Sequence, residues 1–68
     1  MQSDHNISRQ QLLLTIPQVA KTLGLSRAMV YSLIAKGEGP PVIHFGRAVR
    51  VSVASLRKWI EEQEQQSS

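Results

Sequence analysis

Glycine and proline divide the middle of this sequence into short segments, and this division limits the secondary structure that the chain can form. Gly24 separates two segments with helical apolar spacing, residues 37–41 read Gly-Glu-Gly-Pro-Pro, and Gly46 lies between two short apolar runs. Glycine often ends a helix in the left-handed conformation, and proline cannot continue one. We therefore predict helices over about residues 16–23, 27–36 and 53–63, with two strands that turn near Gly46. The predicted order, α-α-β-β-α, is a small α+β fold.

A hydroxyl residue precedes each predicted helix at the position where a side chain can cap it. These residues are Thr15, Ser26 and Ser52, and Gln18 follows Thr15 by three residues, as a capping box requires. Pro17 falls in the first turn of its helix, where the missing N–H has no intrahelical partner to lose. The three caps support the predicted helix starts.

The apolar positions predict one small core. At helical spacing, the candidates for burial are Ile16, Val19, Ala20, Leu23, Val30, Leu33, Ile34, Val53, Leu56 and Ile60. Trp59 is expected to cover the contact between the first and last helices. In the hairpin, the residues expected to cover one side of the core are Val42, Ile43, Phe45, Val49 and Val51. His44 alternates with its apolar neighbours and is expected to face solvent.

The length of 68 residues fits one domain, and the composition excludes several kinds of site. The chain has no cysteine, and its two histidines, His5 and His44, lie far apart, so we expect no disulfide and no metal. No apolar run approaches the ~20 residues of a membrane span, and we expect no signal peptide. Without cysteine, the chain fits the cytoplasm. We predict a flexible arm over 1–12, a domain over 13–62 and a frayed tail over 63–68.

The charge is concentrated in the middle of the chain. All eight lysines and arginines lie between Arg9 and Lys58, and the only acid in that range is Glu38, so its formal charge is +7. Such a basic segment suggests a polyanionic partner such as nucleic acid, although a solvated surface would have the same composition. No nucleophile and base can be paired, because the only aspartate is Asp4 and the other glutamates lie near the end. We therefore expect no catalytic residue, no enzyme activity and no cofactor.

The first two predicted helices form a tight corner. Gly24 supplies the turn, and Ala20 is small enough for the two helices to approach closely. This segment resembles the helix-turn-helix DNA-binding unit, in which the second helix enters the major groove. The positions that match its apolar, small and glycine pattern are Val19, Ala20, Leu23, Gly24, Leu25, Val30 and Leu33.

The second helix has a side left over once its apolar residues turn inward. That side carries Arg27, Ala28, Tyr31, Ser32 and Ala35 and no acid. Long donors and small residues together suit a groove lined with phosphates and base edges, although an exposed helix can have such residues without binding anything. Lys36, at the end of the same helix, is a further candidate contact, but interaction with the helix dipole would explain it equally well.

Residues 13–63 as a whole resemble the winged-helix fold of phage and transposon excisionases, which are related to the DNA-binding domain of MerR-type regulators. The matching features are "LT" at the start of the first helix, "LGLSR..VY.LI..G" through the second, "GR..R" in the wing and "S...L..WI" in the last helix. In that family the second helix reads the major groove and the wing reaches an adjacent minor groove. The resemblance therefore implies contacts from Ser26, Arg27, Tyr31, Ser32, Arg47 and Arg50, with Gly46 at the wing turn. Ala28 and Ala48 depart from the family, whose members often carry polar or basic residues there.

The resemblance also implies a function. An excisionase is a recombination directionality factor: several copies bind and bend attachment-site DNA and help a separate integrase to excise a phage or mobile element. The implied partners are double-stranded DNA, an integrase and further copies of the chain, in the host cytoplasm and not at a membrane. The segment over residues 37–41 is more similar to AlpA-type prophage activators, so a small transcriptional regulator of the AlpA or MerR-like kind is the main alternative. A protein-interaction adaptor is a more distant one.

Overall fold

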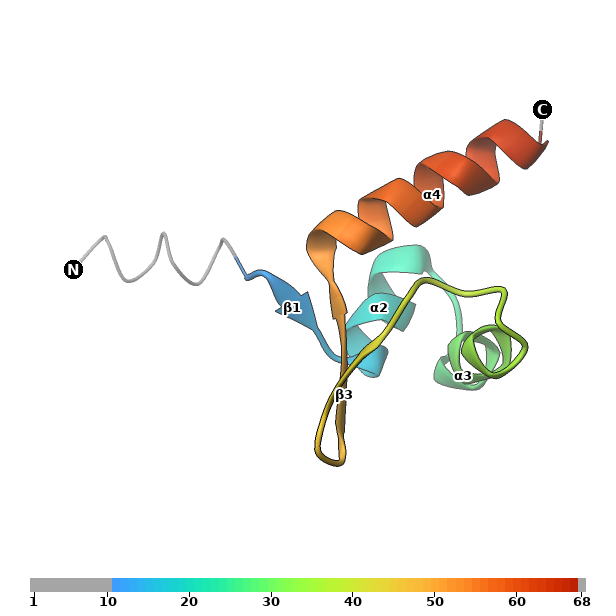
Figure 1. Cartoon of the computed structure of the whole chain (residues 1–68). Helices are drawn as coiled ribbons and strands as arrows, with labels where there is room; N and C mark the ends of the chain where they lie inside the picture. Colours follow the sequence, from blue (N-terminus) through green and yellow to red (C-terminus); the bar gives the residue numbers. More distant parts are fainter. Residues whose placement is uncertain (1–10, 68) are drawn as a thin grey trace.

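Three helices and a three-stranded antiparallel sheet make up the computed structural model, which describes residues 11–67 (Figure 1). The elements in chain order are β1 (Leu13–Leu14), α2 (Ile16–Leu23), α3 (Arg27–Ala35), β2 (Ile43–Phe45), β3 (Ala48–Ser52) and α4 (Val53–Ser67). The predicted α+β class and winged helix-turn-helix architecture are confirmed. Residues 1–10, which make up most of the predicted arm, lie outside the described residues.

The helix starts agree with the predicted caps. The Oγ1 atom of Thr15 accepts a hydrogen bond from the backbone N–H of Gln18, and the Gln18 side chain accepts one from the N–H of Thr15, which completes the capping box. The Ser26 hydroxyl accepts from the N–H of Met29 at 3.1 Å. The Ser52 hydroxyl accepts from the N–H three residues further on at 3.0 Å. Each cap satisfies a backbone donor that has no partner within its helix.

Two helix ends differ from the predicted ones. Helix α3 ends at Ala35, and Lys36 is its C-cap rather than its last residue. Helix α4 continues through Ser67, beyond the predicted end at Gln63. No glycine or proline follows Ile60, and glutamate and glutamine are good helix formers, so nothing in the sequence stops the helix there.

The sheet contains a strand that the sequence did not predict. Leu13 and Leu14 pair with Ser52 and Val51, and the N–H of Val53 donates to the Leu12 carbonyl at 2.9 Å. The strand order is β1-β3-β2, so β3 is the central strand. A strand of two residues is too short to show the alternation by which strands are recognised in a sequence.

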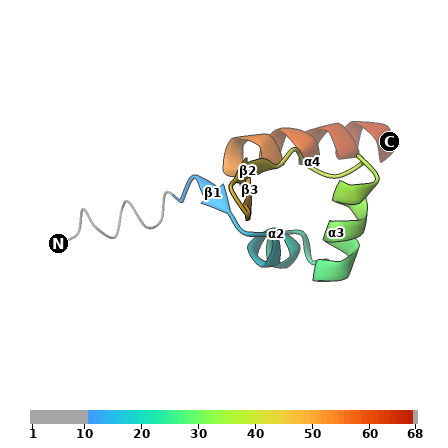
Figure 2. The ribbon, with the colours of Figure 1, turned by 60° about the horizontal axis from the view of Figure 1, so that its bottom comes forward.

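The core lies between the central strand and the three helices, and β3 packs directly against α2 and α4. Figure 2 shows the helices arranged around this interior. Its buried members are Ile16, Val19 and Ala20 from α2, Val30 from α3, Val51 from β3 and Leu56 from α4. The partly buried residues around it are Leu14, Leu23, Ile34, Val42, Val49, Trp59 and Ile60. Because each of these helices and β3 contributes a buried side chain, the core fixes the positions of the helices relative to the hairpin.

Strand β2, the outer strand of the hairpin, turns its apolar side chains away from the core, opposite to the prediction. Ile43 and Phe45 are 41% and 53% exposed, so the expectation that they cover the core is wrong. They pair with Arg50 and Ala48, and side chains directly opposite each other in an antiparallel pair share one face of the sheet. Val51 is fully buried, which places residues 48 and 50 and their partners on the outer face. His44 is exposed, as expected, but its pairing with Val49 places it on the same face of the sheet as Val51, so the predicted alternation with Ile43 and Phe45 is reversed.

Candidate nucleic-acid interface

A tight corner joins α2 to α3, and Gly24 forms it. Gly24 has φ +72° and ψ +28°, the left-handed conformation, and its N–H donates to the Lys21 carbonyl at 3.2 Å. The next N–H, that of Leu25, donates to the Ala20 carbonyl at 2.9 Å. A Cβ atom on Gly24 would meet no atom within 4 Å, so the backbone conformation, and not lack of space, requires glycine here. This corner sets the direction in which α3 leaves α2.

The N-terminus of α3 is open to solvent and free of negative charge. Ser26, Arg27 and Ala28 are all exposed, and the first turn of α3 contains no acidic residue. The partial positive charge at the start of a helix is therefore not neutralised by the helix's own side chains. Such an end attracts phosphate groups, which its free backbone N–H groups can bind.

One side of α3, which we call the α3 outer face, is formed by Arg27, Ala28, Met29, Tyr31 and Ser32. The first four side chains are exposed, with Tyr31 at 55%, and Ser32 is half-buried. Val30 is fully buried, so the opposite side of the helix faces the core. Four of the predicted candidates, Arg27, Ala28, Tyr31 and Ser32, therefore belong to this face, whereas Ser26 caps the start of the helix and Lys36 lies at its end.

Lys36 lies at the other end of the helix. As the C-cap of α3, it donates its backbone N–H to the Ser32 carbonyl at 3.0 Å, and its side chain is exposed. Ser26 caps the opposite end, so the structure does not bring Lys36 to the N-terminal part of the α3 outer face. A cation at this end also interacts favourably with the helix dipole.

Met29 is a member of the α3 outer face that sequence reasoning missed. Its side chain is 48% exposed and belongs to neither the buried core nor the partly buried residues around it. The available signal was its angular position, because Met29 lies about 100° from Val30 and about 140° from Ile34 around the helix, and these two residues define the side that faces the core.

The hairpin between β2 and β3 ends in a two-residue turn. Phe45 pairs with Ala48, and the residues between them are Gly46, with φ +61°, and Arg47. A positive φ at the first of the two turn positions is what a type II′ hairpin turn requires, and glycine adopts it without strain. Arg47 is exposed at the end of the hairpin.

Arg50 differs from Arg47 in its surroundings. It is half-buried on the outer face of the sheet, and its Nη1 atom donates to the neighbouring Val49 carbonyl at 2.9 Å. One of its five N–H donors is therefore used within the hairpin, and the others are left for a partner. The two arginines predicted for the wing thus lie at its tip and on its flank.

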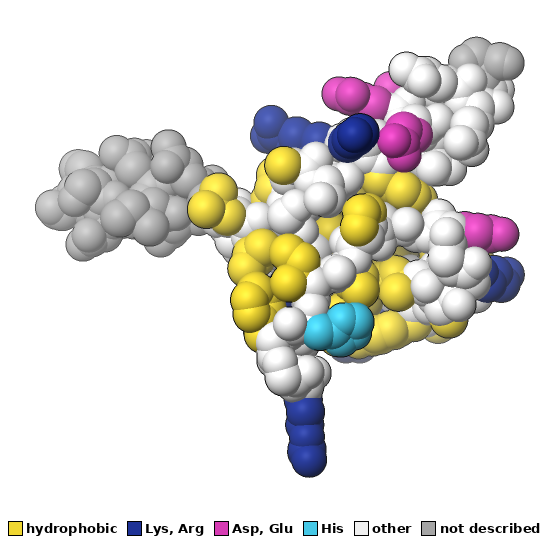
Figure 3. All heavy atoms as spheres, viewed as in Figure 1, with side chains coloured by type: hydrophobic (Ala, Val, Ile, Leu, Met, Phe, Trp, Pro, Cys, Tyr) yellow, Lys and Arg dark blue, Asp and Glu magenta, His cyan; other side chains and the backbone are white. Residues whose placement is uncertain are grey.

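The hairpin and α3 lie on either side of α2. In Figure 1, α4 lies at the top, whereas the hairpin and α3 lie below it with α2 between them. The second view agrees, with the strands on one side of α2 and α3 on the other (Figure 2). Figure 3 shows a basic side chain extending from the far end of the hairpin and acidic side chains over α4. The far end of the hairpin therefore carries positive charge without an acidic neighbour, whereas basic and acidic side chains lie together over α4.

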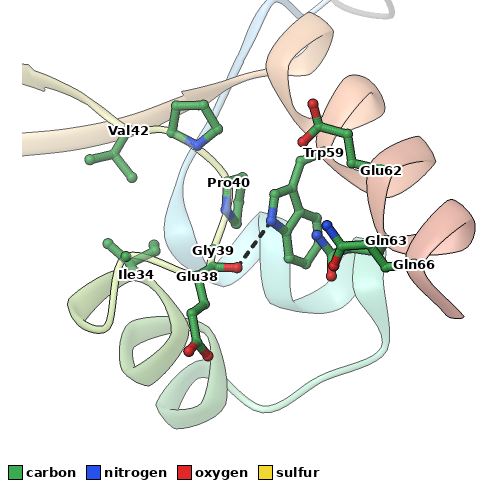
Figure 4. Close-up of a pocket in the computed structure, with 11 residues that line it drawn as sticks. Ile34, Glu38, Gly39, Pro40, Val42, Trp59, Glu62, Gln63 and Gln66 are labelled. Atoms are coloured by element: carbon green, nitrogen blue, oxygen red, sulfur yellow. Dashed lines mark hydrogen bonds between the residues drawn. The ribbon is translucent and has the colours of Figure 1, made fainter.

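Trp59 connects α4 to the segment that follows α3. Its indole Nε1–H donates to the Glu38 carbonyl at 3.1 Å. The ring lies beside Pro40 and Gly39, in a groove between α4 and the segment that follows α3 (Figure 4). A second groove places Trp59 beside Leu23 at the end of α2. The prediction that Trp59 covers the contact between the first and last helices is therefore incomplete, because the ring also contacts the segment after α3.

The described residues show no arrangement suited to holding a metal. Among residues 11–67, no three His, Cys, Asp or Glu side chains form a group that could bind one. Within the same range, no helix is long and apolar enough to cross a membrane.

Comparison with known proteins agrees with this geometry. Residues 13–64 match the family model described as a helix-turn-helix domain. The uncharacterized protein ORF88 of Enterobacteria phage P4 is 46% identical to the chain over 37 residues. That match covers 54% of this chain and 42% of the phage protein, so the chain spans less than half the length of this curated relative.

Proposed function

Because the chain belongs to the helix-turn-helix domain family, which implies DNA binding, we propose that it is an excisionase, a recombination directionality factor. In this proposal several copies bind side by side on attachment-site DNA, bend it, and help a separate integrase to assemble the excision complex. The protein has no catalytic activity of its own, and it acts on DNA in the host cytoplasm. The family includes excisionase-like and AlpA-like proteins, and one relative comes from a phage.

The observation that carries the proposal is the acid-free N-terminus of α3 in a domain whose hairpin ends in the exposed Arg47. Helix α3 inserts into the major groove, where Arg27 and Tyr31 contact base edges and Ser26 and Ser32 contact phosphates or bases. Arg47 enters the adjacent minor groove, and Arg50 contacts the backbone beside it. A narrow minor groove has an enhanced negative potential that attracts such an arginine.

Several copies and DNA bending follow from the size of the domain. Small DNA-binding modules bury only about 600–1,000 Å² of protein surface, so one copy offers few contacts. Adjacent copies add their phosphate contacts, and bending brings further DNA surface against them.

Footprinting and gel-shift titrations on fragments of the DNA that flanks the gene test this proposal, with and without the proposed integrase partner. We expect a protected region longer than one domain covers, an increased bend, and more excision product when the protein is added to integrase. The double variant Arg27→Ala plus Arg47→Ala should lose binding. The matched control, Arg57→Ala plus Lys58→Ala, removes the same charge from exposed positions on α4 and should retain it.

The outcomes separate the proposal from its alternatives. Binding that overlaps a promoter and changes transcription without integrase would assign the protein to the AlpA-like or MerR-like regulators, which the segment over residues 37–41 favours. Loss of DNA binding in both double variants to the same degree would mean that only net charge matters. Retained binding of a protein partner, with no binding to any DNA, would make the chain an interaction adaptor.

A further inference from the structure

The α3 outer face is more apolar than a phosphate-binding surface needs to be. Building on the proposed function, we infer that Ala28 and Met29 read the 5-methyl groups of thymines in the major groove. The protein therefore selects sites with thymines opposite the first turn of α3. Both side chains are exposed, and Met29 is 48% exposed although it is a large apolar residue.

Nothing in the fold of the chain itself explains Met29. It lies three residues after the Ser26 cap, the position at which glutamine or glutamate completes a capping box. In α2 the equivalent residue is Gln18, which does complete the box. In α3 the Ser26 hydroxyl accepts from the Met29 N–H, but the methionine side chain has no polar group to return the bond. Met29 thus contributes neither to the cap nor to the core.

The polar groups of α3 restrict which bases the helix can read by hydrogen bonds. Adenine is best recognised by asparagine or glutamine, and cytosine by a carboxylate. Residues 27–36 contain no asparagine, glutamine, aspartate or glutamate. Arg27 can form the paired contact to guanine, and the hydroxyls of Tyr31 and Ser32 fit either base edges or phosphates.

The groove feature that remains for the apolar side chains is the thymine methyl group. It projects into the major groove, and alanine and other apolar side chains contact it in specific complexes. Ala28 belongs to the first turn of α3, the part of a recognition helix that contacts base edges. Met29 is unbranched and flexible, so it can follow the groove wall beside Ala28. A G·C-only site would leave both side chains without an apolar partner.

The test replaces thymine by deoxyuridine, which removes only the methyl group. Binding sites are first selected from a random-sequence duplex library, and each thymine of the preferred site is then replaced singly. We expect a loss of about fourfold at each contacted position, which corresponds to the ~0.8 kcal/mol of one buried CH₂-sized group. Replacement outside the protected region should change nothing.

Variants assign the contact to the helix. Met29→Ala should weaken binding to the thymine site and remove the effect of deoxyuridine at one position. Ala28→Ser should do the same at a neighbouring position. Leu12→Ala, which truncates an exposed apolar residue next to β1, is the matched control and should keep the full deoxyuridine effect.

The contrary results are distinct. A selected site that binds equally well with every thymine replaced would overturn this inference and leave sequence-specific DNA binding intact. A deoxyuridine effect that persists unchanged in Met29→Ala and Ala28→Ser would place the methyl contact on another element, which also overturns it. A library from which no sequence is enriched would overturn both this inference and the proposed function.

Discussion

At the scale of single residues, Gly24 shows most directly how backbone conformation fixes the position of α3. We predict that Gly24→Ala destabilises the protein by about 1–2 kcal/mol, because an L-residue in the left-handed conformation carries that strain. Contacts with other parts of the protein add nothing to this cost, since a Cβ atom there meets no atom beyond its chain neighbours within 4 Å. Urea unfolding followed by Trp59 fluorescence measures the change. Gly24→Asn is the control and should recover part of the loss, because asparagine tolerates this conformation better. Equal stability of Gly24→Ala and the parent protein would contradict the argument.

Trp59 is the second residue whose role can be isolated. We predict that Trp59→Phe lowers the free energy of unfolding by about 1 kcal/mol, the usual contribution of one hydrogen bond, because the indole N–H no longer reaches the Glu38 carbonyl. Thermal unfolding followed by far-UV circular dichroism measures the effect. Tyr31→Phe also removes one polar group from an aromatic ring, but at an exposed position, and should leave the midpoint unchanged. If both variants unfold like the parent, the contact does not stabilise the fold.

At the scale of the elements, the hairpin has one side that supports the fold and one that does not. We predict that Val51→Ala destabilises the protein by about 2 kcal/mol, because it removes two methyl groups from a fully buried position and leaves a cavity. Phe45→Ala removes a larger side chain, but one that is 53% exposed on the outer face, and should cost less than about 1 kcal/mol. Thermal unfolding of the two variants compares them directly. The reverse order would mean that β2 turns its apolar residues towards the core after all.

The elements also show which parts of the fold can be read from a sequence. The helix starts at Thr15, Ser26 and Ser52 were predictable because each cap is a local hydrogen bond between residues three apart. The face of the sheet on which the β2 side chains lie was not predicted. It depends on the pairing of β2 with β3, and the burial of Val51 decides which face of β3 is turned towards the core. Strand β1 was missed because its two residues acquire strand geometry only by pairing with β3.

The candidate site was predictable to a similar degree. The grouping of Arg27, Ala28 and Tyr31 follows from helical periodicity, and Arg47 at the turn follows from Gly46. The exposed Met29 was assigned neither to the core nor to the candidate contacts, because an unbranched apolar side chain has no charge or hydrogen-bonding group that would indicate a contact with DNA. The half-buried state of Arg50 and its bond to the Val49 carbonyl depend on the hairpin conformation, which its position in the sequence does not specify.

At the scale of the whole molecule, the core couples the two parts of the proposed interface. Val30 holds α3 and Val51 holds the hairpin, and both belong to the same cluster of buried residues. The hairpin extends from this cluster through β3, the central strand of the sheet. The α3 outer face and Arg47 are therefore presented by one packed unit rather than by independent segments, which lowers the conformational entropy lost when both engage DNA.

The proposed arginine contacts predict how the DNA affinity of the whole molecule responds to salt. Each phosphate that a lysine or arginine neutralises releases counterions, so the logarithm of the association constant falls linearly with the logarithm of the salt concentration, with a slope of about −0.9 per contact. Arg47→Ala removes one proposed contact at the hairpin tip and should make the slope shallower by about 0.9, with a similar relative loss on every sequence. Arg57→Ala removes an exposed charge from α4, outside the proposed interface, and should leave the slope unchanged. Gel-shift titrations at several salt concentrations, on a preferred duplex and an unrelated one, measure both quantities.

Arg27→Ala provides the contrast, because loss of a guanine contact should reduce affinity for the preferred duplex more than for the unrelated one. Identical slopes for Arg47→Ala and the parent protein would remove the hairpin from the interface, and DNA binding would then depend on α3 alone.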